Sequence, residues 1–128
     1  MKTFVTWVVI FVVGLLVGFV PQYWKAHNLR TDLESCNITA SVAQVKQSAA
    51  LTYVTATQLN YGVAAGYAQQ MFAQAQNLAN SSSDNNVRNL MNQILSSRDK
   101  ITADLAKGDS AVVGELQPVV LQLEKGGQ

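Results

Sequence analysis

The stretch "NSSSDNNVRNLMNQIL", residues 80–95, contains both a turn and the start of a helix. Its first five residues are small and polar, and Ser83 or Asp84 is placed to cap the helix that follows. Beyond the cap, apolar residues recur every three or four positions: Val87, Leu90, Met91, Ile94, Ile101 and Leu105. This period is typical of an amphipathic helix. We therefore predict a helical hairpin that folds back at residues 80–84.

The same period extends toward the N-terminus, through Ile38, Val42, Val45, Ala49, Ala56, Leu59 and Val63. No proline interrupts the chain between residues 39 and 79, so the pattern predicts one long helix over this range. Residues 52–57 include β-prone threonines and a tyrosine, but both flanks keep the helical period. No strand is expected anywhere in the chain.

On the C-terminal side, Lys107-Gly108-Asp109 predicts a helix end and a new cap. A last helix follows, with apolar positions at Val112, Val113, Leu116, Val119, Val120 and Leu123. Pro118 is expected to kink this helix or divide it into two short pieces. Short connections force neighbouring helices to run antiparallel. The predicted fold class is therefore all-α: an antiparallel hairpin or small bundle over residues 38–125, made of a long helix and two shorter ones, with 126–128 as a disordered tail.

The first residues of the chain have a different character. Residues 4–20 carry no charge, and at about 1.5 Å per residue they extend roughly 25 Å, close to the ~30 Å of a bilayer's hydrocarbon core. Trp7 at one end, and Tyr23 and Trp24 at the other, are aromatic residues suited to the two membrane interfaces. We predict a single-pass transmembrane anchor over residues 1–24, which continues into a juxtamembrane stalk helix over 25–37. The alternatives are a cleaved signal peptide, although no small-residue cleavage pattern follows the apolar run, and a buried core helix.

Two glycines in the predicted anchor, Gly14 and Gly18, have the small-xxx-small spacing that lets membrane helices approach closely. This spacing favours a parallel homodimer. Cys36 lies eighteen residues after Gly18, about five helical turns. In a straight helix the dimer would bring two Cys36 thiols together, and an oxidising compartment could join them in an intermolecular disulfide. The alternative is a free thiol on the stalk.

A second glycine pair, Gly62 and Gly66, lies in the predicted long helix, where each glycine costs up to about 1 kcal/mol relative to alanine. Close packing between helices is one explanation. The other is a ligand crevice lined by Tyr53, Tyr67 and Met71, which would share one face of a single helix.

The composition argues against several classes of function. Nine basic and eight acidic residues give a net charge of +1 without a basic cluster, which argues against nucleic-acid binding. One Cys and one His cannot form a Cys/His zinc site within one chain. No catalytic or cofactor-binding motif is present, and His27 has no neighbouring nucleophile. We expect no enzyme activity, no metal and no cofactor.

These features predict a non-enzymatic, single-pass membrane protein that acts as a scaffold or as an accessory or assembly subunit. Its partners would be the lipid bilayer and an unidentified protein. Only three residues precede the apolar run at the N-terminus, and Lys2 lies directly beside it, which favours a cytoplasmic N-terminus. The membrane would then be a bacterial inner membrane, and the bundle would lie on its extracytoplasmic side. One alternative is an extracytoplasmic sensor or small-molecule-binding bundle. Another is an envelope rod that resembles the inner-membrane spanins of bacteriophages, on architecture alone.

Overall fold

The computed structural model describes residues 1–126, except for the side chains of 2–5, 9, 15–24 and 27. Every regular element in this part of the chain is a helix, which confirms the all-α prediction. The helices are α1 (Lys2–Thr57), α2 (Tyr61–Ser81), α3 (Asn85–Ser96), α4 (Arg98–Lys107) and α5 (Ala111–Gly126). The chain divides into two compact units, residues 1–36 and residues 37–128.

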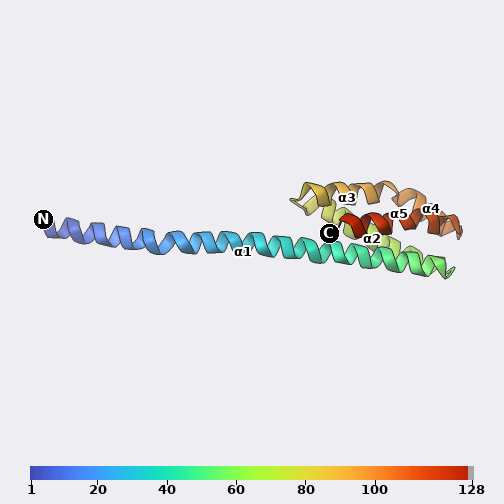
Figure 1. The fold of residues 1–128 in the computed structure, drawn as a ribbon, viewed down its shortest axis with the longest axis horizontal. Helices are drawn as coiled ribbons and strands as arrows, with labels where there is room; N and C mark the ends of the chain where they lie inside the picture. The colour runs from blue at the N-terminus through green and yellow to red at the C-terminus, as the bar shows by residue number, and fades with distance from the viewer. Residues whose placement is uncertain (127–128) are drawn as a thin grey trace. The chain divides into compact units, whose positions relative to one another are not determined.

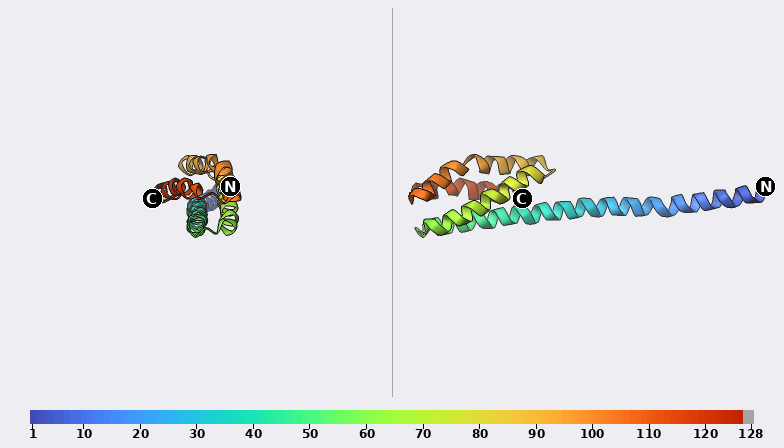
Figure 2. Two further views of the ribbon diagram at one scale, coloured as in Figure 1. Left: turned by 90° about the vertical axis from the view of Figure 1, so that its right-hand side faces the viewer. Right: turned by 180° about the vertical axis from the view of Figure 1, so that it is seen from behind.

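The second unit is a helical bundle. Its chain runs along the last part of α1, returns along α2, reverses again through α3 and α4, and returns once more along α5 (Figure 1). The views in Figure 2 show these segments lying side by side. Each reversal takes only a few residues, and such short connections place consecutive segments next to each other in opposite directions.

All five helices contribute side chains to the core of this unit. The largest fully buried side chains include Val45 in α1, Met71 in α2, Ile94 in α3, Ile101 in α4 and Leu116 in α5. The apolar positions predicted from the period in α3, α4 and α5 are mostly buried here. Burial of this apolar surface, at roughly 25 cal/mol per Å², is the main force that holds the helices together.

The predicted single helix over residues 39–79 is wrong, because the chain reverses at Gln58–Asn60. Leu59 has a left-handed backbone, with φ of 61°. Its N–H donates to the carbonyl of Ala56, and the N–H of Asn60 donates to the carbonyl of Thr55, both at 3.0 Å. This pair of bonds is the Schellman motif that closes a helix C-terminus. The Asn60 side chain then accepts the N–H of Val63 and caps α2.

The turn between α4 and α5 has the same pattern of hydrogen bonds and was predicted. Gly108 has φ of 68° and donates to the carbonyl of Leu105, while Asp109 donates to the carbonyl of Asp104. The two turns differ in the left-handed residue, which is glycine in one and leucine in the other. Glycine adopts this conformation without a steric cost, so it marks a helix end in the sequence, and leucine does not. The first turn was therefore missed.

Three further positions, Asp84, Ser97 and Pro118, were expected to affect helix boundaries or lie within the later helices. Asp84 caps α3 as predicted, because its Oδ1 accepts the N–H of Asn86 at 2.8 Å. Ser97 divides the helix expected before Lys107 into α3 and α4. The predicted division of the last helix at Pro118 does not occur, since α5 continues through this residue as one element. Proline has no N–H to donate to the carbonyl four residues earlier in the helix. Pro118 is exposed, so water can bind that carbonyl instead.

The unit of residues 1–36 consists of the first part of α1. Among the residues whose side chains are described, no helix contains a stretch long and apolar enough to cross a membrane. Several residues of the predicted span, 15–20 among them, lie outside that set.

Candidate functional site

The predicted anchor residues are only partly described. Trp7 is 77% exposed, and Gly14 is also exposed, with no atom within 4 Å of the position that a Cβ would occupy. Gly18, Tyr23 and Trp24 lie outside the described residues. The pairing of two chains through the glycines of the anchor stays a prediction.

The stalk presents an apolar stripe. Ala26, Leu29, Leu33 and Cys36 are all exposed, and their spacing of three, four and three places them along one side of the helix. Leu29 and Leu33 are 62% and 65% exposed. Cys36 has a free thiol in this single chain. The exposed thiol is accessible for an intermolecular disulfide, which stays a prediction.

Gly62 and Gly66 do not pack against another helix of the chain. Both are exposed on α2, and a Cβ built on either one meets no atom within 4 Å. The helix turns its alanines inward instead, with Ala64 and Ala68 buried. The glycines lie on the opposite side of α2 from the core. Close approach of another helix at this glycine pair stays a prediction.

The three residues of the predicted crevice do not share one helix. Tyr53 lies in α1, while Tyr67 and Met71 lie in α2, beyond the turn at residues 58–60. Met71 is fully buried and belongs to the core, and Tyr53 is partly buried against it. Tyr53 therefore does not share a helix face with Tyr67 and Met71. The binding of a small ligand in this region stays a prediction.

Buried polar groups of the bundle are paired within the chain. Thr52 is fully buried, and its hydroxyl donates to the carbonyl of Ser48 at 2.7 Å. The Ser48 hydroxyl in turn donates to Oε1 of Gln74 at 3.1 Å, which links α1 to α2. Among the described residues, every buried side-chain nitrogen or oxygen has a hydrogen-bond partner. These interactions have a structural role, since each partner lies in the bundle itself.

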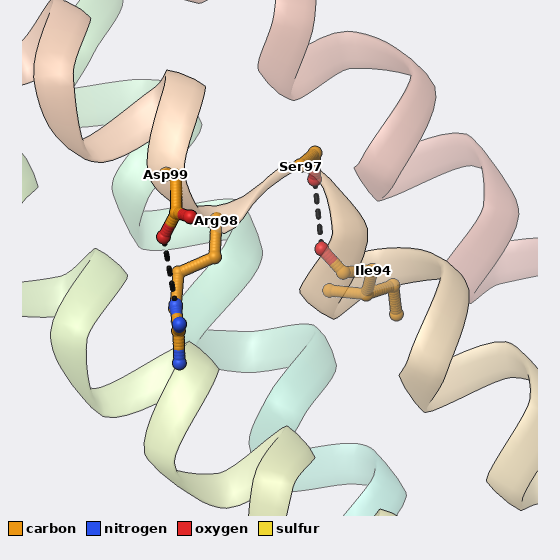
Figure 3. A network of polar contacts seen from close by, with 4 residues as sticks. All are labelled: Ile94, Ser97, Arg98 and Asp99. Atoms are coloured by element: carbon orange, nitrogen blue, oxygen red, sulfur yellow. Dashed lines mark hydrogen bonds and ion pairs between the residues drawn. The ribbon is translucent and has the colours of Figure 1, made fainter.

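A small polar network lies at the junction of α3 and α4 (Figure 3). The Ser97 hydroxyl donates to the carbonyl of Ile94 at 2.8 Å, and Nε of Arg98 donates to Oδ1 of Asp99 at 3.2 Å. Ile94 itself is fully buried. The serine thus satisfies a carbonyl at the end of α3, and the adjacent ion pair is exposed to solvent, where such pairs contribute little to stability.

A second ion pair joins α4 to α5. The Lys100 ammonium donates to Oε1 of Glu115. This hydrogen bond, together with the attraction of the carboxylate, raises the pKa of Lys100 above its ordinary value. The Lys100 side chain is 72% exposed and the Glu115 side chain 20%, so the pair links α4 to α5 at the surface, where ion pairs contribute little to stability.

Charge is distributed unevenly over the bundle. Residues 47–83, which include the end of α1 and all of α2, contain no Asp, Glu, Lys or Arg. The charged residues that follow begin at Asp84 and continue through α3, α4 and α5. Sequence reasoning missed this feature, although a simple search for charged residues would have found it. Depletion of charge is the compositional mark of the centre of a protein interface, so the hairpin of α1 and α2 is the candidate interaction surface.

Other kinds of site have less support in the described residues, which hold no cluster of three His, Cys, Asp or Glu side chains that could bind a metal ion. No protein-family model, curated protein or solved structure matches this chain.

Proposed function

We propose that this chain is a non-enzymatic membrane protein that crosses a bilayer once, through its N-terminal segment, and presents a helical bundle to protein partners. In this role it acts as a scaffold, or as an accessory subunit in the assembly of a larger complex. The membrane is the inner membrane of a bacterium, and the bundle lies on its extracytoplasmic side.

The exposed apolar residues near the start of α1 carry this proposal. Six of them follow one another with a single gap: Trp7, Val8, Ile10, Phe11, Val12 and Val13. Consecutive helical residues point about 100° apart, so this segment is apolar around its whole circumference. A helix of that kind is stable inside a large protein or in lipid. The absence of charge from residue 4 to residue 20 supports lipid.

Protein contact, rather than chemistry, is supported by the surface of the bundle. The hairpin of α1 and α2 offers no charged side chain between residues 47 and 83, and its buried polar groups, such as Thr52 and Ser48, are paired within the chain. A surface depleted of charge is suited to burial against another protein.

Membrane insertion is tested with the variant Phe11→Arg/Val12→Arg. Each arginine near the centre of a membrane helix costs about 2.5–3.5 kcal/mol. We expect the natural chain to stay in the membrane fraction of a bacterial host after alkaline extraction, and the double-arginine variant to leave it. Phe11→Leu/Val12→Leu is the matched control and is expected to stay. Release of the natural chain itself would overturn the proposed anchor.

Orientation and pairing in the membrane are tested through Cys36, the only thiol of the chain. We expect a membrane-impermeant maleimide to label intact cells, and a non-reducing gel to contain a dimer that reductant dissolves. The control Cys36→Ser is expected to lose both signals. Labelling only after lysis would place the bundle in the cytoplasm and contradict the proposed side of the membrane.

A further inference from the structure

The exposed side of the charge-free hairpin carries apolar, small and uncharged polar residues. We call it the neutral face and define it by five exposed residues: Leu51 and Val54 in α1, and Val63, Gly66 and Gln70 in α2. Spacings of three and four place the members from each helix along one side of it. The bundle residues 38–126 have five large apolar side chains that are exposed among those described, and four of them belong to this hairpin: Leu51, Val54, Leu59 and Val63.

The glycines of α2 have no explanation inside the chain. Each one costs up to about 1 kcal/mol relative to alanine at an exposed helical position. A Cβ on Gly62 or Gly66 would meet no atom within 4 Å, so folding does not require glycine at either position. The missing side chains leave the backbone of α2 open to close approach by another helix.

Charge decides which partner fits the neutral face. In a two-fold symmetric dimer the same patch meets itself, so each charged residue near the axis meets its own copy. The faces formed by α3, α4 and α5 carry charged side chains such as Arg88, Lys107 and Glu124, and any of these that lay near the axis would face its own copy. Like charges brought together at an interface cost several kcal/mol. The neutral face can meet its own copy without this cost wherever the axis crosses it, and it offers nothing to attract a strongly charged partner.

We infer that the neutral face binds the neutral face of a second copy of this chain, so that two bundles associate side by side through α1 and α2. This inference deepens the proposed function by naming a partner for the bundle. It does not depend on membrane insertion, which the alkaline extraction above tests separately.

The test uses the purified full chain in detergent micelles, with Cys36→Ser as background to remove the natural thiol. Single cysteines are placed in turn on the neutral face and treated with a short bis-maleimide crosslinker: Val54→Cys, Gly66→Cys and Gln70→Cys. Control cysteines occupy exposed positions on the other helices: Asn92→Cys, Ala103→Cys and Gln117→Cys. We expect dimers of the chain from at least one neutral-face position and none from the controls.

Charge repulsion tests whether this dimer depends on the neutral face. The charge is added to the single-cysteine variant that gives the neutral-face crosslink. There, Val63→Glu is expected to reduce the crosslinked fraction by at least about tenfold, equivalent to 1.4 kcal/mol. Val63→Leu, the matched control, is expected to retain it. A mixture of chains carrying Val63→Glu and Val63→Lys is expected to recover crosslinking, because opposite charges then meet. Because Val63 is exposed, the variants are expected to fold like the natural chain. Helicity measured by circular dichroism checks this.

Three outcomes would overturn the inference. Equal crosslinking at neutral-face and control positions would indicate random contact within micelles. Absence of any crosslinked dimer from the neutral face, in a chain that is folded, would leave this surface without a second copy. If the same cysteines crosslink in intact cells to a protein of different mass and never to the chain itself, the occupant is a different protein and the inference is wrong.

Discussion

Leu59 shows how a single residue can hide a reversal of the chain. Among the described residues, Leu59 is the one residue other than glycine whose φ is positive. Its side chain is 68% exposed. A left-handed conformation costs an L-residue about 1–2 kcal/mol relative to glycine. The exposed Leu59 side chain buries little apolar surface that could offset this conformational cost. The packing of α1 against α2 must therefore balance it.

Replacing this leucine is expected to stabilise the bundle. In Leu59→Gly, relief of the left-handed strain exceeds the backbone entropy that glycine adds to the unfolded chain, about 0.5–1 kcal/mol. We expect the free energy of unfolding to rise by about 0.5–1 kcal/mol in urea titrations followed by circular dichroism. Leu59→Ala retains a Cβ and should leave stability nearly unchanged. A loss of stability in the glycine variant would mean that the Leu59 side chain contributes contacts.

At the scale of elements, two glycines near α5 have opposite roles. Gly108 ends α4 in a left-handed conformation, whereas Gly114 lies within α5, where a Cβ would meet nothing within 4 Å. A Cβ on Gly108 would lie 3.5 Å from Cδ2 of Tyr61, an ordinary contact. The role of Gly108 is therefore conformational, and steric crowding does not require a glycine there.

The same substitution is expected to have opposite effects at these two positions. Gly108→Ala should lower the free energy of unfolding by about 1–2 kcal/mol, because alanine is strained at positive φ. Gly114→Ala should raise it by up to about 1 kcal/mol, because alanine is the better helix former. Urea unfolding of both variants beside the natural chain checks the pair. A change of the same sign in both would contradict the assigned backbone conformations.

At the scale of the whole molecule, the buried core formed by the described side chains lies within one of the two units. The core side chains extend from Val45 to Leu123, all within residues 37–128. The apolar residues that this unit buries belong to α1 after Asn37 and to the four later helices. Its stability should therefore depend little on the residues that precede it.

A chain that begins at Asn37 is accordingly expected to fold alone. It should be helical and unfold in a single cooperative thermal transition measured by circular dichroism. Met71→Ala in this shorter chain should lower the free energy of unfolding by about 2–5 kcal/mol, since Met71 is fully buried. The exposed substitution Gln69→Ala is the control and should have little effect. A broad, non-cooperative transition in the shorter chain would indicate that residues 1–36 contribute to the core.

The sequence by itself determined the features that depend on a few neighbouring residues. The helical period identified buried positions such as Ile94, Ile101 and Leu116, and the Asp84 cap and the Gly108 stop were both confirmed. Capping and left-handed glycine are local effects, in which the side chain and the backbone groups it affects lie within about one helical turn. Such features can be recognised without knowing what packs against them.

The tertiary structure alone decided the reversal at Leu59, the division at Ser97 and the outward position of Gly62 and Gly66. Local preference opposes a left-handed leucine, and continuous helical periodicity favours one long helix. The reversal lets α2 pack back against α1, so that Ala56 and Met71 are buried in one core. This gain is summed over many contacts between distant residues and outweighs about 1–2 kcal/mol of strain at one residue. It also sets which side of α2 faces the core, and therefore leaves the glycines exposed.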